Sequence, residues 1–224
     1  MTETNVLFDL PDLVVRQIAV SEMANNIYLL TAKRTGHQIL IDAADDFAAI
    51  DELIKSAAND SEVPPKLGLI ATTHSHWDHV RALAALVEQT STPSAAGRAD
   101  AAGIEAESGV VTDLLLDHGN SLDVDGISLK IVHLRGHTPG SIAYVLESVV
   151  EAVPTVIFSG DSLFPGGVGN TEQDPERFAS LLNDVEERLF AVYPDPTVVL
   201  PGHGAATTLG TERPALPQWR ERGW

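Results

Sequence analysis

Hydrophobic residues in the first quarter of the chain follow two different periods. Short apolar runs rich in β-branched side chains, separated by polar or glycine-containing turns, predict strands at residues 12–20, 25–32 and 37–43. Residues 45–60 predict a helix instead, because their apolar positions recur at helical spacing. Those positions are Phe47, Ile50, Leu53, Ile54 and Ala57. The three strands follow one another closely, so we expect them to pair as a meander.

The alternation continues through the rest of the chain. An apolar run predicts a buried strand at residues 66–73, and the pattern that follows predicts a helix at residues 78–89. Further strands are predicted at residues 127–134, 141–148, 154–160 and 197–204. The clearest amphipathic pattern predicts a helix at residues 174–193, with Asp174 as its N-cap and Pro175 at its first position.

Strands that alternate with helices predict a layered α/β fold. No low-complexity segment and no long linker interrupts the pattern, so residues 1–224 are expected to form a single domain. The sequence gives no indication of the oligomeric state.

Composition narrows the class of protein. The formal net charge of −18 would repel a phosphate backbone, which argues against nucleic acid as a partner. The chain has no cysteine, its first residues do not resemble a signal peptide, and no apolar run approaches the roughly 18 residues of a membrane span. We therefore expect a cytoplasmic protein with no membrane partner.

The stretch Thr73–His79, with the sequence THSHWDH, carries three of the eight histidines. His74 and His76 point the same way in an extended segment, so both can reach one ion. Asp78 and His79 are redirected where the chain turns into the next helix, and can face a neighbouring point. Imidazole and carboxylate groups suit zinc, iron or manganese, and the absence of cysteine excludes thiolate ligands.

Three more residues of metal-ligand type follow predicted strands. His137 lies in LRGHTPGS, Asp161 in FSGDSLF and His203 in LPGHGAA. The carboxyl ends of strands are where α/β enzymes usually build their sites, so we expect these residues near the histidine cluster. The remaining histidines of the second half, His118 and His133, together with His37, are interpreted as turn, surface or packing residues.

The order of these motifs, H-x-H-x-D-H, GHTPG, GDSLF and PGHG, resembles the metallo-β-lactamase superfamily, and within it the glyoxalase II-like hydrolases. The resemblance runs from about Asn25 to His203. It implies an αββα sandwich of two mixed sheets flanked by helices, with a two-metal site at one edge. It further implies that Asp161 bridges two ions, the first held by His74, His76 and His137, and the second by Asp78, His79 and His203.

The resemblance also implies a reaction. Two divalent ions would lower the pKa of a bound water toward 7 and provide hydroxide for attack on an acyl carbon. Zinc is the first expectation for these ions, with iron or manganese as alternatives. Asp78 is expected to orient this nucleophile or carry a proton. The predicted substrate is a small thioester or related acyl compound.

Other functions stay open at this point. A persulfide dioxygenase-like oxidoreductase, using a single iron, resembles the same motif set. The complete ligand set argues against a non-enzymatic member of the superfamily, and the acidic charge argues against a member that processes nucleic acid. The lack of an export signal and of a cysteine ligand argues against a β-lactamase.

Two departures from glyoxalase II concern the substrate. First, related proteins often carry arginine or lysine at the position of Asn170, where the cation can pair with a carboxylate of the thiol. Second, we expect no counterpart of the helical C-terminal domain that helps to bind glutathione in those enzymes. Asn170 is therefore the candidate substrate-binding residue, and a glutathione thioester is disfavoured. The C-terminal stretch RPALPQWRERGW is expected to dock against the core.

Overall fold

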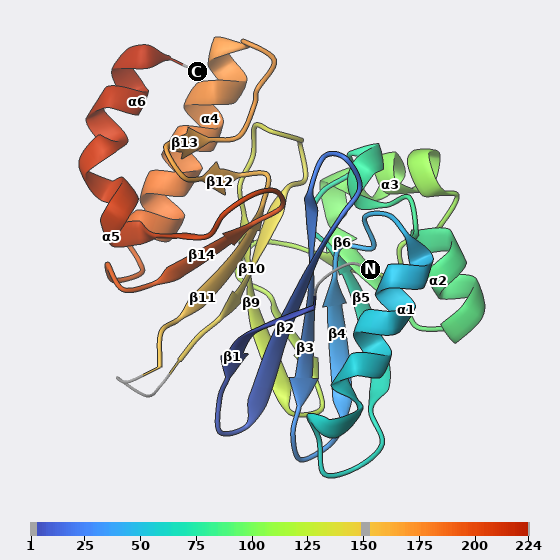
Figure 1. Ribbon diagram of the computed structural model, residues 1–224. Helices are drawn as coiled ribbons and strands as arrows, with labels where there is room; N and C mark the ends of the chain where they lie inside the picture. The colour runs from blue at the N-terminus through green and yellow to red at the C-terminus, as the bar shows by residue number, and fades with distance from the viewer. Residues whose placement is uncertain (1–3, 149–152, 224) are drawn as a thin grey trace.

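The computed structural model describes residues 4–148 and 153–223 as two facing β-sheets with helices on both outer sides (Figure 1). The first sheet has seven strands in the order β1 to β7. They are β1 (Asn5–Asp9), β2 (Leu13–Val20), β3 (Asn25–Ala32), β4 (His37–Ile41), β5 (Lys66–Thr72), β6 (Ser94–Gly97) and β7 (Leu114–Leu116). The strands from β1 to β4 pair antiparallel, which confirms the predicted meander, and those from β4 to β7 pair parallel.

The second sheet has six strands in the order β15-β14-β11-β10-β9-β8. They are β8 (Ser121–Val124), β9 (Ile127–His133), β10 (Ile142–Leu146), β11 (Val156–Gly160), β14 (Val198–Pro201) and β15 (Thr207–Thr208). Within it only β11 and β14 pair parallel, so this sheet is mixed as well. A small hairpin of β12 (Leu163–Phe164) and β13 (Gly167–Val168) follows β11.

The helices divide between the two outer faces (Figure 1). On the first sheet lie α1 (Phe47–Ser56), α2 (Leu83–Thr90) and α3 (Ala101–Ser108). On the second lie α4 (Pro175–Val185), α5 (Leu209–Glu212) and α6 (Leu216–Arg222). The predicted αββα sandwich of two mixed sheets is therefore confirmed.

Alternation of apolar side chains along buried strands explains the four layers. Strand β3 is buried throughout, and it sends Tyr28 and Leu30 between the sheets but Ile27 and Leu29 toward the helices. Residues at i and i+2 share one face of a strand, so one continuous apolar run can fill two adjacent layers. Strand β11 repeats this on the other sheet, with Phe158 facing inward and its neighbour Ile157 facing the outer layer.

Two predicted helices differ from the structure in length. The segment predicted as helix 78–89 begins with a 3₁₀ turn at Trp77–His79, and α2 starts only at Leu83. In the helix predicted at 174–193, the Asp174 carboxylate caps the first turn as expected, but α4 gives way after Val185 to a π-helical turn, Glu186–Phe190.

The C-terminal segment docks on the outer face of the second sheet. Leu209 and Trp219 are buried in the apolar layer under α4, and the Trp219 ring packs against Phe190 with centroids 6.4 Å apart. Arg220 adds hydrogen bonds to Asn183 and Glu186. None of the described helices is long and apolar enough to cross a membrane.

Candidate metal centre

All seven side chains predicted as metal ligands lie at one edge of the sandwich. His74, His76, Asp78 and His79 follow β5, His137 follows β9, Asp161 follows β11 and His203 follows β14. The first four come from one sheet and the last three from the other. The site is therefore assembled from loops that meet only because the two sheets face each other.

Ligand atoms in this cluster fall into three overlapping groups. Within each group the candidate atoms lie within 4.8 Å of one another, a separation that one ion can span. The groups are His74, His76 and His137; Asp78, His79 and His203; and His74, His79 and Asp161. The first two groups match the two ligand sets implied by the sequence.

Asp161 lies between the two sets. Its carboxylate oxygens are 3.7 Å from His137 Nε2 on one side, and 3.5 Å from His79 Nε2 and 3.4 Å from His203 Nε2 on the other. Close approach of the backbone makes this possible, because a Cβ at Gly202 would stand 2.2 Å from Asp161 Oδ1. The glycine of PGHG is therefore required by the position of the carboxylate.

Two histidine rings are oriented by the nitrogen that faces away from the cluster. His137 Nδ1 lies 2.7 Å from the carbonyl of Asn170, and His203 Nδ1 lies 2.9 Å from that of Met23. A carbonyl oxygen only accepts, so both Nδ1 atoms carry the proton and both Nε2 atoms present a lone pair to the cluster. Metal-binding histidines are usually held in this way.

Asp42 orients the other two buried rings, and the sequence did not single it out. Its carboxylate accepts from His79 Nδ1 at 2.9 Å, from the Thr73 hydroxyl at 2.8 Å and from the Thr73 amide at 2.8 Å. Because the Thr73 hydroxyl donates to Asp42, it accepts from His74 Nδ1 at 3.0 Å. Asp42 directly follows the apolar strand β4 and has a positive φ of 60°. An aspartate directly after an apolar strand is the sequence signal that could have revealed it.

Asn25 holds Asp78, the residue predicted to take part in catalysis. The fully buried Asn25 amide donates to Asp78 Oδ2 at 2.9 Å, and its own oxygen accepts from Ser21 at 2.7 Å. The second Asp78 contact is His203 Nε2, 3.2 Å from Oδ2. The structure thus places Asp78 inside the cluster with a fixed carboxylate, while its role in proton transfer remains a prediction.

Asp100, which the sequence also did not single out, ties the two ligand loops together. Its buried carboxylate accepts from the amide of Ser75 at 2.9 Å, from the hydroxyl of Thr138 at 2.5 Å and from the amide of Gly140 at 2.6 Å. Ser75 stands between two predicted ligands, and Thr138 directly follows His137. Asp100 therefore fixes the distance between the loop after β5 and the loop after β9.

The donor set fits a divalent cation. Among the described residues, the buried atoms His137 Nε2 and Asp161 Oδ1 have no hydrogen-bond partner. His79 Nε2 and His203 Nε2 face each other at 3.2 Å. Burial lowers the pKa of His203, but hydrogen bonds with Asp161 and Asp78 outweigh it and raise the pKa to about 10. The two carboxylates thus favour positive charge at this point, and a bound metal could supply it in place of a proton.

Asn170 contributes its backbone rather than its side chain to this centre. Its carbonyl accepts from His137 Nδ1, and its side-chain oxygen accepts from the amide of Glu172 at 2.8 Å. The residue is exposed. The predicted contact between its side chain and substrate remains a prediction. The three histidines interpreted as structural, His37, His118 and His133, belong to none of the ligand groups.

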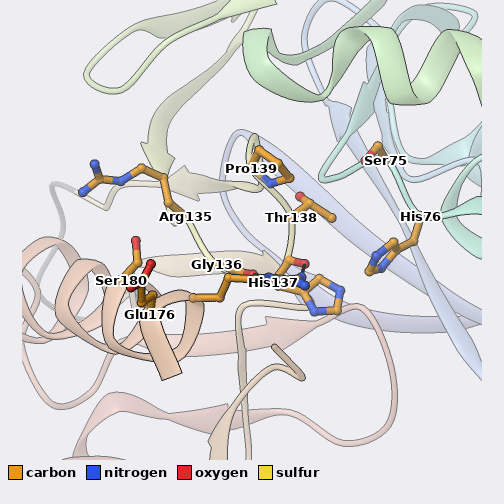
Figure 2. A pocket seen from close by; sticks show the side chains of 10 residues that line it. Ser75, His76, Arg135, Gly136, His137, Thr138, Pro139, Glu176 and Ser180 are labelled. Carbon is orange, nitrogen blue, oxygen red and sulfur yellow. Dashed lines mark hydrogen bonds between the residues drawn. The ribbon is translucent and has the colours of Figure 1, made fainter. Parts of the chain in front are cut away.

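A pocket of about 600 Å³ opens beside the first ligand set. His76 and His137 form one end, residues of the loop after β9 form the floor, and Glu176 and Ser180 of α4 form a wall (Figure 2). Its size is within the range of small-molecule sites.

Comparison with known proteins agrees with this fold and cluster. The profile of the metallo-beta-lactamase superfamily matches residues 20–203, and the chain belongs to that superfamily. The relatives include the hydroxyacylglutathione hydrolase GloC of Haemophilus influenzae, which is 30% identical over 173 residues, covering 70% of this chain and 77% of GloC. An uncharacterized protein of Mycobacterium tuberculosis is 39% identical over 95 residues, and the chain spans only 42% of its length.

Two solved structures extend the comparison. ETHE1 from Myxococcus xanthus has a TM-score of 0.75 and 26% identity, covering 92% of this chain and 84% of ETHE1. TTHA1623, solved in a di-iron-bound form, has a TM-score of 0.66 and 29% identity, covering 88% of this chain and 96% of TTHA1623.

Proposed function

We propose that the protein is a two-metal hydrolase acting on a small thioester or related acyl substrate. One observation carries the proposal, namely two groups of three ligands with the Asp161 carboxylate between them. Two bound divalent ions would supply an acidified water and polarise an acyl oxygen. Zinc is the proposed metal, with iron or manganese as alternatives, because the donors are imidazole and carboxylate only.

The chain's own residues would orient the reactants. Asp78, fixed by Asn25, presents a carboxylate beside both ligand sets and can accept a hydrogen bond from an attacking water. Burial raises the pKa of Asp78, but the contact with His203, the charge of His79 and the hydrogen bond from Asn25 together lower it, so the group stays ionised at neutral pH. The names of the relatives support the proposal: GloC is a hydroxyacylglutathione hydrolase, and TTHA1623 was solved with two irons.

Metal analysis of the purified protein, combined with a hydrolysis panel, tests this function. We expect about two ions per chain, and turnover of small thioesters above that of matched lactones. One iron per chain with oxygen uptake and no thioester hydrolysis would instead support the mononuclear iron oxidoreductase that the motifs left open.

Asn170→Arg tests the choice of thiol. We expect the native chain to hydrolyse S-lactoylglutathione poorly compared with a thioester of a thiol without free carboxylates. The new arginine should improve the glutathione substrate by about 10- to 100-fold, the effect of one charge-assisted hydrogen bond of 1.5–3 kcal/mol. Most of the gain should appear in KM, since the contact is made equally before and in the transition state.

Steady-state kinetics of both proteins on both thioesters provide the measurement, and Asn170→Gln is the neutral control. Efficient native hydrolysis of the glutathione thioester, unchanged by the arginine, would show that residue 170 does not select the thiol.

A further inference from the structure

The pocket beside His76 and His137 contains two arginines with different roles. Arg177 is fully engaged, because its guanidinium donates to the carbonyls of Gly136 at 2.8 Å and His137 at 2.6 Å, and to the Glu172 carboxylate at 2.7 Å. It therefore holds the loop that carries His137. Its charge is already paired with Glu172.

Arg135 is different, because part of its guanidinium remains available. Its Nε and Nη2 form a two-point pair with Asp184 at 2.8 and 2.7 Å. Among the described residues the Nη1 amino group has no acceptor, and 52% of the Arg135 side chain is exposed. Arginine offers five N–H donors in a fixed plane, so the pair with Asp184 fixes the plane without using all of its donors.

Arg135 shares its carboxylate partner with a second arginine. Asp184, 2% exposed, is shared between Arg135 and Arg188, whose Nη2 lies 3.3 Å from Asp184 Oδ1. One buried carboxylate thus compensates two guanidinium groups. Glu187 contributes a further acidic charge on the same helical segment, and Glu176 lies across the pocket. These three acidic groups outnumber the two guanidinium groups, so recognition of an acidic ligand would depend on a direct hydrogen bond from Arg135 Nη1 and not on a net positive charge.

The position of Arg135 connects it to the reaction. Arg135 and His137 are separated by one residue, Gly136, and line the same pocket, with Arg135 at the end away from His76 (Figure 2). We infer that this pocket binds the substrate, and that Arg135 is a specificity-determining residue that pairs with a carboxylate of the substrate. The inference rests on the proposed function and names its substrate class: a thioester with a carboxylate away from the scissile bond.

Arg135 could provide the cation that residue 170 lacks. The sequence offers no arginine or lysine at that position, whereas the pocket beside the first ligand set offers Arg135. A substrate carboxylate would be recognised from the loop of His137 instead. Because the proposed function disfavours a thiol with free carboxylates, this carboxylate is assigned to the acyl group, and a pair with the charge on the thiol serves as the control.

Two matched substrate pairs test the inference. The first pair is glutaryl N-acetylcysteamine thioester and its carboxamide counterpart, where the acyl group carries the charge. The second is the acetyl thioester of 3-mercaptopropionate and of its amide, where the thiol carries it. We expect the native chain to prefer the carboxylate in the first pair by about 10- to 100-fold in kcat/KM, mostly through KM, and to show no such preference in the second pair.

Variants separate charge recognition from stability. Arg135→Gln should abolish the preference, and Arg135→Lys should restore part of it, since lysine keeps the charge but not the planar pair. Ser180→Asp should also reduce the preference, because it adds a negative charge to the pocket wall without removing the pair with Asp184. The control is Arg98→Gln, which removes a similarly exposed arginine from its pair with Asp117 outside this pocket and should leave the preference intact.

The outcomes distinguish this inference from the proposed function. Equal kcat/KM values within the first pair, a preference confined to the second pair, or a preference unchanged by Arg135→Gln and Ser180→Asp would overturn the role of Arg135 while leaving the hydrolase intact. If no thioester is hydrolysed, the proposed function fails. In that case, calorimetry measures the affinity of glutarate and of glutaramate for the native and Arg135→Gln proteins, and the result decides whether Arg135 binds a carboxylate. Selective loss of glutarate affinity supports the acidic-ligand site, and equal affinities overturn it.

Discussion

Asp161→Asn is expected to leave the fold intact and to remove most of the two-metal occupancy. The Asp161 carboxylate lies between both ligand sets, and a neutral amide bridges two cations poorly. Substitutions of residues that merely support a ligand typically cost 10- to 100-fold in metal affinity or activity, so loss of a shared ligand should cost at least about 100-fold. Metal content and hydrolysis rate, measured on the same sample, give the result.

The matched control is Asp123→Asn, an exposed aspartate on β8 outside the ligand groups, which should behave as the native chain does. Circular dichroism should show the same folded spectrum for all three proteins. An Asp161→Asn protein with full metal content and full activity would contradict the two-metal centre.

Removal of metal is expected to lower the melting temperature by about 8–16 °C. An ion that binds only the folded chain, at a free concentration about 1,000 times its Kd, stabilises that chain by about 4 kcal/mol. For a chain of this size each kcal/mol corresponds to about 2–4 °C. Without the ion, the carboxylates Asp78 and Asp161 would lose the cation that balances their charge.

Thermal melting before and after chelation, with metal content verified, measures this effect. Readdition of zinc should restore the original temperature, which separates metal loss from damage by the chelator. A verifiably metal-free sample that melts with the native protein would argue against coupling between the site and the fold.

The sequence predicted the parts of the fold that depend on local apolar patterns. Strand β3 occupies residues 25–32 as predicted, because its unbroken apolar run fills two layers at once. The cap and first turn of α4 were likewise predicted from Asp174 and Pro175. Strand β6, with the sequence SAAG, was missed because small residues carry neither a β-branched signal nor a period.

Tertiary interactions override the pattern in the helix predicted at 78–89. Its apolar spacing is helical, yet Asp78 and His79 are held in a 3₁₀ turn by contacts with Asn25 and Asp42. Those partners lie far away in the sequence, so no local signal could have shortened the helix. The same reason hid Asp42 and Asp100, whose importance depends on which loops they join.

The predicted ligands could be located from the sequence because each follows a predicted strand, and the later three also stand beside a glycine. Clustering of three histidines and an aspartate within seven positions is rare enough to indicate a metal site without any structure. The pocket and the role of Arg135 could not be predicted from the sequence, because they depend on contacts between residues far apart in the chain. Arg135 looks like an ordinary loop arginine until the structure shows which of its donors are engaged and which pocket it lines.

The origin of the ligands from both sheets has a consequence for the order of unfolding. His74, His76, Asp78 and His79 belong to one half of the sandwich, and His137, Asp161 and His203 to the other. Ions held by all seven would act as a cross-link in a chain that has no cysteine to form one. Most of the chain lies between His74 and His203, so such a link would join distant parts of the folded chain. The sheets could then separate only after the ions had left, and the rate of metal release would set an upper limit on the rate of unfolding.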